Sequence, residues 1–439
     1  MAPQDMRGHR ADHRRQGAGG SIRAPCTRAA GLTRWPAGRQ EYGVPAVDRS
    51  VARRIGLPLL VGLAIVWLGV MARDFMTLAK FDYQDLNHFT QGGQFVRDGL
   101  SPYSTAFTQT GNGLPYIYPP VWAIVFAPLS LLPVLVLRVL WTGATLVALW
   151  ALVALSIRQL TRAEPGGRRQ RLLLTTAAAV LTLPLGAVAE VLYYGQVGVF
   201  VVLACIVDAV LLRERRSTWQ GVLVGIATAV KLTPALIVVH WVLTRQYRAA
   251  VTAGATTLVC WGGAAVLVPK LVADYFFGGF VFGIASRIGA ERVNNQSLFG
   301  LLTRLFGETP PMPLYLALAG TVALLGLFLA WRAHRSGNLL AAIAIVGLTS
   351  VLVAPMSWQH HACWIIPALG AVIGDGRRKV RLLGGLAALV ALYSPTQGAQ
   401  LAAYIGFTEF WNLMYVLIIG ALAWLVWRGR SAAALPELA

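Results

Sequence analysis

The sequence has few charged residues for its length. Only 13% of its 439 residues are Asp, Glu, Lys or Arg, whereas a soluble protein carries about 25% because its surface must stay hydrated. Apolar residues make up 56% of the chain, and the mean hydropathy is +0.60. A soluble globule of this size could not cover its surface with so few charges. The composition therefore excludes a cytosolic enzyme, a coiled coil and a largely disordered chain, and it predicts an integral membrane protein.

Cysteine is also scarce, and common catalytic motifs are missing. The spacing of the four cysteines matches neither a disulfide framework nor a metal site, so we interpret them as small apolar side chains: Cys26, Cys205, Cys260 and Cys363. The chain has no Walker loop, no Gly-x-Ser-x-Gly, no His-Glu-x-x-His and no Cys-x-x-Cys pair. No Asp-x-Asp occurs in a predicted external loop, which argues against a metal-bound nucleotide sugar. We expect no cofactor and no metal.

Lysine is rare, with 4 residues against 34 arginines, and the N-terminal segment has no lysine at all. Residues 1–54 contain eleven Arg against four acidic residues, which gives a charge of 11 − 4 = +7. This composition predicts a disordered cytoplasmic tail near anionic lipid, although a start codon placed too early would explain it equally well. No signal peptide precedes the first apolar run. The predicted organisation is this tail, a membrane domain at 55–428 and a short cytoplasmic tail at 429–439.

Apolar runs near the ~20 residues that span a bilayer recur along the chain. Ten of them predict full crossings: residues 55–73, 134–158, 172–190, 197–213, 249–268, 313–333, 339–356, 362–376, 382–395 and 407–428. Prolines interrupt the stretch 119–133, and Lys231 and Pro234 interrupt the stretch 219–244, which predicts a half-helix and a kinked hairpin. The fold class predicted is an all-α bundle of 10–13 membrane helices.

The arginine clusters orient these crossings, because basic residues stay on the cytoplasmic side. One topology places every cluster and both termini in the cytoplasm. It leaves five segments outside: 74–118, 191–196, 269–312, 357–361 and 396–406. These segments contain the unusual polar residues, namely Asp82, Asp85, Gln196, Asn294, Asn295, Gln296, His360 and His361. The sorting used arginine alone, so this clustering independently predicts an active surface on the extracytoplasmic face.

The segment 74–118 carries the first candidate catalytic groups. Asp82 and Asp85 are three residues apart and would share a face if both lay on a helix. A partly buried carboxylate just outside a membrane helix can act as a general base on a sugar hydroxyl. The alternative is a solvated loop carboxylate. The spacing does not decide which of the two aspartates would act.

The stretch Asn295-Gln-Ser-Leu298, followed by Arg304, opens an apolar segment. Its amides and its serine can bind sugar hydroxyls, or Ser297 or Asn295 can cap the start of a helix. Arg304 lies among leucines and a phenylalanine, where a guanidinium is costly unless it meets an anion. A phosphate suits the planar fork of arginine.

Ser357-Trp-Gln-His-His361 is a second polar segment at a membrane boundary. Its imidazoles could bind metal, move protons or contact phosphate, but adjacent histidines point in different directions and make a poor chelating pair. Trp358 would otherwise belong to an interfacial aromatic belt. Lys231, at membrane depth in the hairpin, either extends to the surface or holds a lipid phosphate.

In order along the chain, these motifs resemble glycosyltransferase family 87. The resemblance rests on Asp85-Leu with Tyr103 eighteen residues later, Tyr118-Pro-Pro, Gly195-Gln196, Lys231-Leu-Thr-Pro234, Asn295-Gln-Ser-Leu298 and Ser357-Trp-Gln-His-His361. It covers roughly residues 55–428. No single motif is specific, but the ordered set is. The best-known members are actinobacterial polyprenol-phosphate-mannose-dependent α-mannosyltransferases.

The resemblance implies a GT-C fold with an extracytoplasmic site and a membrane-embedded polyprenyl-phosphate sugar as donor. Asp85 would deprotonate a hydroxyl of a glycolipid or glycan acceptor, which attacks the anomeric carbon with inversion. The resemblance assigns the leaving phosphate to His360, His361, Arg304 and Lys231. It assigns the positioning of sugar and acceptor to Asn295, Gln296, Gln196, Tyr103 and Tyr118. We expect a monomeric, multi-pass enzyme of the cell membrane that transfers mannose and binds no nucleic acid.

Two alternatives remain at this point. The same fold could use another polyprenyl-phosphate sugar, such as arabinofuranose or glucose. The interrupted helices are also typical of secondary transporters or lipid flippases. Transporters place ionisable groups near the bilayer midplane and relate their halves by a repeat, whereas here the carboxylates lie in an external loop and no repeat is seen. This difference favours the enzyme.

Overall fold

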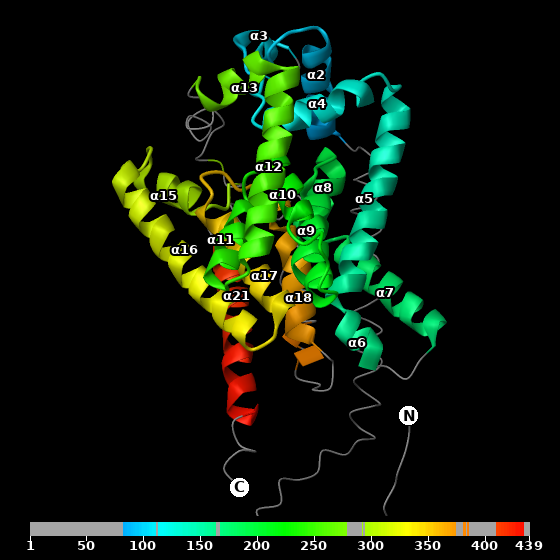
Figure 1. Cartoon of the computed structure of the whole chain (residues 1–439), viewed down its shortest axis with the longest axis vertical. Coiled ribbons are helices and arrows are strands. Elements are labelled where there is room, and N and C mark those ends of the chain that lie inside the picture. Colours follow the sequence, from blue (N-terminus) through cyan, green and yellow to red (C-terminus); the bar gives the residue numbers. More distant parts are fainter. Residues whose placement is uncertain are drawn as a thin grey trace, which may run out of the picture. The chain divides into compact units, whose positions relative to one another are not determined.

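The computed structural model describes residues 82–110, 113–163, 167–278, 292, 295–374, 381–382, 384–385 and 410–433. The predicted tail 1–54, the crossing 55–73, most of the crossing 382–395 and the loop 396–406 lie outside these residues. In the described ranges every regular element is a helix, which confirms the all-α class (Figure 1).

Among the described residues, three helices are long and apolar enough to cross a membrane: α5 (Val134–Ser156), α12 (Tyr247–Leu267) and α16 (Met312–Arg335). Much of their apolar surface is exposed, as expected of helices that face lipid; Val147 on α5 is 69% exposed and Val259 on α12 is 73% exposed. The shorter α17 (Leu339–Val353) is instead buried on all sides and packs against α16, α18 (Ile365–Ile373) and α21 (Phe410–Ala433). The number of full crossings stays a prediction.

Both stretches that were predicted to be interrupted form short helices. In the first, α4 (Pro120–Leu129) begins at a proline, which needs no N–H partner in the first helical turn. In the second, α10 (Val222–Val230) and α11 (Ala235–Leu243) are separated by Lys231–Pro234, where Lys231 adopts an extended conformation. The physical cause is Pro234, which disfavours helical dihedrals in the residue before it and lacks an N–H donor.

The run 172–190, which was predicted to be one crossing, is not a single continuous helix in the described structure. It forms two helices, α7 (Arg168–Thr182) and α8 (Gly186–Tyr194), with a turn between them. Pro184 and Gly186 lie at this turn, and both residues disfavour a continuous helix. The break matters because it separates α8, which carries a buried carboxylate, from the basic start of α7.

The remaining helices are short: α2 (Gln84–Arg97), α3 (Thr105–Thr108), α6 (Arg158–Ala163), α9 (Gly198–Ile206) with a π-helical continuation at Val207–Leu212, α13 (Pro269–Phe276), α15 (Leu298–Phe306) and a 3₁₀ segment at Gln359–Trp364. Among them, α2 positions the site. It packs against α4 so closely that a Cβ on Gly93 would lie 2.4 Å from the backbone of Phe126. Phe89 of α2 is fully buried against the same residue.

The start of α2 is tied to two other helices. Tyr83 precedes it with φ +49°, donates its N–H to the carbonyl of Tyr193 (3.0 Å) and makes a hydroxyl contact with Thr142 (2.8 Å). Because of this left-handed residue, Asp82 lies before the helix and Asp85 lies in its first turn. The two aspartates therefore do not share a helical face, and Asp82 is exposed.

Candidate active site

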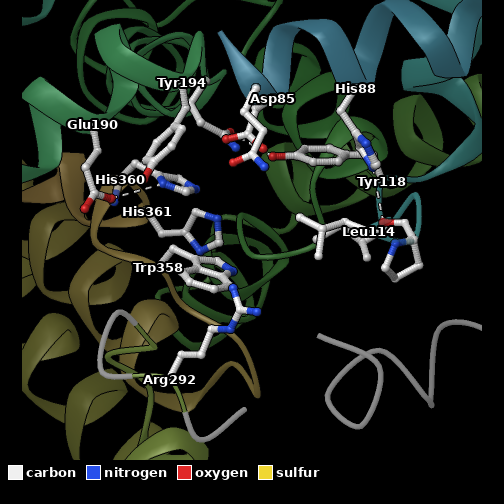
Figure 2. Close-up of a pocket in the computed structure, with 14 residues that line it drawn as sticks. Asp85, His88, Leu114, Tyr118, Glu190, Tyr194, Arg292, Trp358, His360 and His361 are labelled. Atoms are coloured by element: carbon white, nitrogen blue, oxygen red, sulfur yellow. Dashed lines mark hydrogen bonds and ion pairs between the residues drawn. The ribbon is translucent and has the colours of Figure 1, made fainter. Parts of the chain in front are cut away.

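A cavity of about 170 Å³ lies where α2, the Pro115–Tyr118 segment, the end of α8 and the segment Trp358–His361 meet (Figure 2). Five residues singled out from the sequence line it: Asp85, Tyr118, Gln196, His360 and His361. They come from positions up to 276 residues apart (361 − 85) in the chain. The fold thus brings together a carboxylate, an amide, a phenol and two imidazoles from separate predicted external segments.

Asp85 faces this cavity from the first turn of α2 (Figure 2). Desolvation raises the pKa of its carboxyl group above the ordinary value. A neighbouring His360, a hydrogen bond with the Gln196 side chain and the charge of Lys231 all act in the opposite direction. A carboxylate with a raised pKa has the basicity that proton abstraction from a sugar hydroxyl requires.

The position of Gln196 depends on a left-handed turn and a tyrosine. Gly195 ends α8 with φ +70°, and a Cβ there would lie 2.7 Å from Cβ of Leu86. The hydroxyl of Tyr118 donates to Oε1 of Gln196 (2.9 Å), which leaves the amide N–H₂ of Gln196 as its donor toward Asp85. Tyr103 does not line the cavity, and its hydroxyl donates to the carbonyl of Tyr118 behind it (2.7 Å).

The two histidines lie side by side, with ring centroids 4.6 Å apart and planes at 86°. Their different directions agree with the expectation that adjacent histidines make a poor chelating pair. Burial lowers the pKa of His360 to about 3, and burial together with Lys231 and His360 lowers the pKa of His361 well below its ordinary value. Both imidazoles are therefore neutral near pH 7.

Glu190 is a site residue that the sequence did not reveal. Its Oε2 accepts the backbone N–H of His360 (3.2 Å) and lies 3.3 Å from Nδ1 of the same residue (Figure 2). Glu190 is 4% exposed, on α8, and was counted as the last residue of an apolar run. A carboxylate inside such a run was the available signal, because buried ionisable groups in membrane proteins tend to be functional.

Arg292, Trp358, Tyr194 and His88 also line the cavity. Trp358, for which an aromatic belt was one alternative, lies on the wall of the cavity (Figure 2). Nε2 of His88 lies 3.2 Å from the carbonyl of Pro115. Burial lowers the pKa of His88 to about 4, so this ring is also neutral. Its contact with the Pro115 carbonyl links α2 to the segment before α4.

Lys231 lies beside the cavity rather than in its wall. Its Nζ is buried, has no hydrogen-bond partner among the described residues and lies 5.7 Å from the ring centroid of Tyr118. Together with Ser357 and His361 it lines a separate, smaller cavity. The ammonium group does not extend to the surface, which was one of the two alternatives. A buried ammonium without a partner is costly, so it favours an anionic ligand nearby.

Asn295, Gln296 and Arg304 support the histidine segment and do not line the cavity. Oδ1 of Asn295 accepts the N–H of Ser357 (3.0 Å), and the N–H of Gln296 donates to the carbonyl of Ser357 (2.7 Å). Arg304 donates to the carbonyls of Asn295 (2.9 Å) and Arg292 (3.2 Å). Backbone carbonyls thus provide the partners that the apolar neighbours of Arg304 cannot.

Ser297 is the N-cap of α15, since its hydroxyl oxygen accepts the N–H of Gly300 (3.0 Å). One of the two capping alternatives is thereby confirmed. In the described ranges no group of three or more His, Cys, Asp and Glu side chains converges in a way that could hold a metal ion. The independence from metal stays a prediction.

The chain is similar in sequence to known proteins. Residues 116–355 match glycosyltransferase family 87. The chain is 33% identical over 363 residues to a polyprenol-phosphate-mannose-dependent alpha-(1-2)-phosphatidylinositol pentamannoside mannosyltransferase of Mycolicibacterium smegmatis, which covers 80% of this chain and 84% of that protein. It is 31% identical over 356 residues to a Mycobacterium tuberculosis protein of the same description, with 80% and 79% coverage.

A second kind of relative in Mycolicibacterium smegmatis is described as a phosphatidylinositol mannoside mannosyltransferase; it is 29% identical over 366 residues, with 78% of this chain and 81% of that protein covered. No solved structure matches the chain significantly. The family match excludes the transporter alternative, and the apolar helices show a membrane protein. The chain belongs to glycosyltransferase family 87 and is a membrane glycosyltransferase.

Proposed function

We propose that this enzyme transfers mannose from a polyprenyl-phosphate mannose to a hydroxyl group of a phosphatidylinositol mannoside. The relatives' descriptions support the sugar, the donor and the acceptor class. The observation that carries the chemistry is Asp85, whose carboxyl group has a raised pKa and faces a cavity shared with His360 and His361. The cavity has the volume of several water molecules, which suits one sugar ring rather than a whole glycolipid.

Asp85 is the general base of the proposed reaction. Its carboxylate takes the proton of the acceptor hydroxyl as the oxygen attacks the anomeric carbon of the donor. The bond from that carbon to the phosphate oxygen breaks on the opposite side, and polyprenyl phosphate leaves with the electron pair. A single displacement of this kind inverts the anomeric configuration. Positioned general bases contribute roughly 10²–10⁴ in rate.

The leaving phosphate gains negative charge, and the groups opposite Asp85 suit this change. The neutral imidazole of His361 can donate one N–H, while Arg292 and Lys231 supply positive charge from the cavity wall and from beneath Tyr118. His360, whose Nδ1 faces Glu190, donates through Nε2 when its ring is protonated beside the phosphate. Arg304 acts through the carbonyls of Arg292 and Asn295 that it holds. Glu190 holds His360 by the backbone N–H and Nδ1, so that Nε2 is the ring nitrogen left for the ligand.

Gln196 and Tyr118 are proposed to position the sugar, because they line the cavity beside Asp85. Tyr103 contributes through its hydrogen bond with the carbonyl of Tyr118. Asn295 and Gln296 contribute through their hydrogen bonds with the backbone of Ser357. The site is proposed to open on the extracytoplasmic face, as the arginine clusters predict, with both termini in the cytoplasm and about ten crossings. The enzyme is proposed to act as a monomer.

The test is a transfer assay with the purified full-length protein. Donors are polyprenyl-phosphate mannose, polyprenyl-phosphate glucose and polyprenyl-phosphate arabinofuranose, each offered with phosphatidylinositol mannosides of increasing size. We expect mannose transfer to at least one of these acceptors and an inverted product. Transfer of glucose or arabinofuranose in place of mannose would change the substrate but keep the mechanism. Retention of configuration would overturn the single displacement.

A further inference from the structure

A second cavity, of about 240 Å³, lies away from the active site at the other end of α10. Four arginines line it: Arg213 and Arg216 follow the π-helical turn, and Arg245 and Arg248 surround the start of α12. These residues form two clusters 29 residues apart in the sequence (245 − 216). Since α10 begins at Val222 beside this cavity and ends next to Lys231, about 14 Å of helix separates the two sites.

Among the residues that the structure describes, the nearby carboxylates do not neutralise the positive charge of this cavity. Glu214, between the two arginines of the first cluster, is paired with Arg158. The carboxylate of Asp208 accepts the N–H groups of Gly221 (2.7 Å) and Val224 (2.8 Å) at the start of α10. Both acidic side chains of this region are therefore occupied elsewhere, which leaves the arginines to attract an external anion.

The floor of the cavity is polar and ordered. Gln220 and Gln246 are 9% and 8% exposed, and their side chains are joined by a hydrogen bond of 3.2 Å. The first turn of α12, Tyr247 to Ala249, forms the adjacent wall. The first N–H groups of a helix have no partner inside the helix, and they favour a negative group at this end. The arginines and the first turn of α12 thus line one volume, which is large enough to hold a phosphate group.

The surroundings of the cavity are apolar. Trp219 and Tyr247 flank it and are 69% and 57% exposed, as is typical of aromatic residues at a membrane interface. Next to the cavity, the end of α11 and the start of α12 present exposed apolar side chains, namely Val242, Leu243 and Val251. An anion that also carries hydrocarbon would satisfy both the cavity and this face.

We propose that this arginine cavity binds the phosphate of an anionic glycerophospholipid of the surrounding bilayer, with the acyl chains lying along α11 and α12. The ligand class follows from charge complementarity with four arginines and from the apolar face that continues from the cavity. Basic pockets between membrane helices are suited to such head groups. Both arginine clusters were assigned to the cytoplasmic side, so the lipid belongs to the cytoplasmic leaflet.

The test measures thermal unfolding of the full-length protein in a neutral detergent. Dioleoylphosphatidylglycerol, dioleoylphosphatidylcholine and inorganic phosphate are titrated separately. The variant is Arg216→Asn with Arg245→Asn; both residues have positive φ (51° and 59°), which asparagine tolerates well, so charge is removed with little backbone change. The control is Arg168→Asn with Arg169→Asn at the start of α7, which removes the same charge outside the cavity.

We expect phosphatidylglycerol to raise the unfolding temperature of the wild type and of the control, and phosphatidylcholine to do so far less. The cavity variant should need roughly 30-fold more phosphatidylglycerol for the same shift. Equal loss in the control would mean diffuse attraction and would overturn the site. An equal effect of inorganic phosphate would overturn the lipid assignment. If the variant fails to fold, the wild type still decides, since no preference for phosphatidylglycerol over phosphatidylcholine also overturns the proposal.

Discussion

At the scale of single residues, the proposed mechanism depends most on Asp85. Asp85→Asn keeps the shape of the side chain and removes its basicity, so transfer should slow by roughly 10²–10⁴. Asp82→Asn is the matched control, because Asp82 is exposed and precedes α2. Its effect should be small. Initial rates with polyprenyl-phosphate mannose provide the measurement, and wild-type activity in the Asp85 variant would remove the core of the mechanism.

The raised pKa of Asp85 predicts a pH dependence. The base must be ionised, so kcat/KM should rise with pH through the raised pKa and then level off. The hydrogen bond with Gln196 lowers this pKa, and Gln196→Leu should therefore move the acid limb to higher pH. Asp82→Asn should leave the limb in place. A limb that stays fixed in the Gln196 variant would show that Asp85 does not control it.

Glu190 is predicted to be a positioning residue for His360. Glu190→Ala removes the oxygen that accepts the backbone N–H and faces Nδ1, and supporting groups of this kind are worth roughly 10–100-fold in activity. The effect should fall on kcat more than on KM, with Glu190→Gln recovering part of it through its amide oxygen. Loss of fold without partial recovery in the Gln variant would indicate a purely structural role.

At the scale of elements, the segment Asn295–Ser297 braces the segment that carries the histidines. Asn295 is fully buried and accepts the N–H of Ser357, while its Nδ2 donates to the carbonyl of Pro355 (3.3 Å). Asn295→Ala would leave a buried N–H without an acceptor, at a cost of about 1–3 kcal/mol.

We therefore expect Asn295→Ala to lower both the unfolding temperature and the transfer rate, because His360 and His361 lose their support. Asn87→Ala, at an exposed position of α2, is the control. Unfolding curves and rates should be measured on the same preparations. An unchanged rate would show that the brace does not set the histidine positions.

At the scale of the whole molecule, the topology can be tested with reporter insertions. Gly111 lies in a predicted external segment and Gly376 in a predicted cytoplasmic one, so reporters at the two positions should report opposite sides of the membrane. Identical answers would contradict the topology and the proposed extracytoplasmic site together. Activity of each insertion variant serves as the control for a native fold.

Several features of the fold could be predicted because they depend on local chemistry. Proline lacks a backbone N–H donor, and this accounts for the start of α4 and for the break between α10 and α11. The break at Pro184 follows the same rule but was missed, since the flanking residues are all apolar. Ser297 as a helix cap is likewise a local matter.

The members of the site could be predicted only in part. Asp85, Gln196 and the two histidines could be predicted because polar residues are conspicuous in an apolar chain, and Tyr118 came from the family resemblance. Arg304 was expected to contact the leaving phosphate, but it holds the backbone carbonyl of Arg292, and it is Arg292 that lines the cavity. Their sequence context does not distinguish these roles, because the direction of each side chain depends on how two distant segments pack.

The sequence by itself determined that this is a helical membrane protein, where its helices break and which residue types were available for sugar transfer. These properties follow from hydration and backbone chemistry, which act within a few residues. Only the tertiary structure decided that Glu190 meets His360, that Lys231 is buried under Tyr118 and that two arginine clusters share one cavity. Such contacts join residues far apart in the chain, and they are set by the packing of helices rather than by any local pattern.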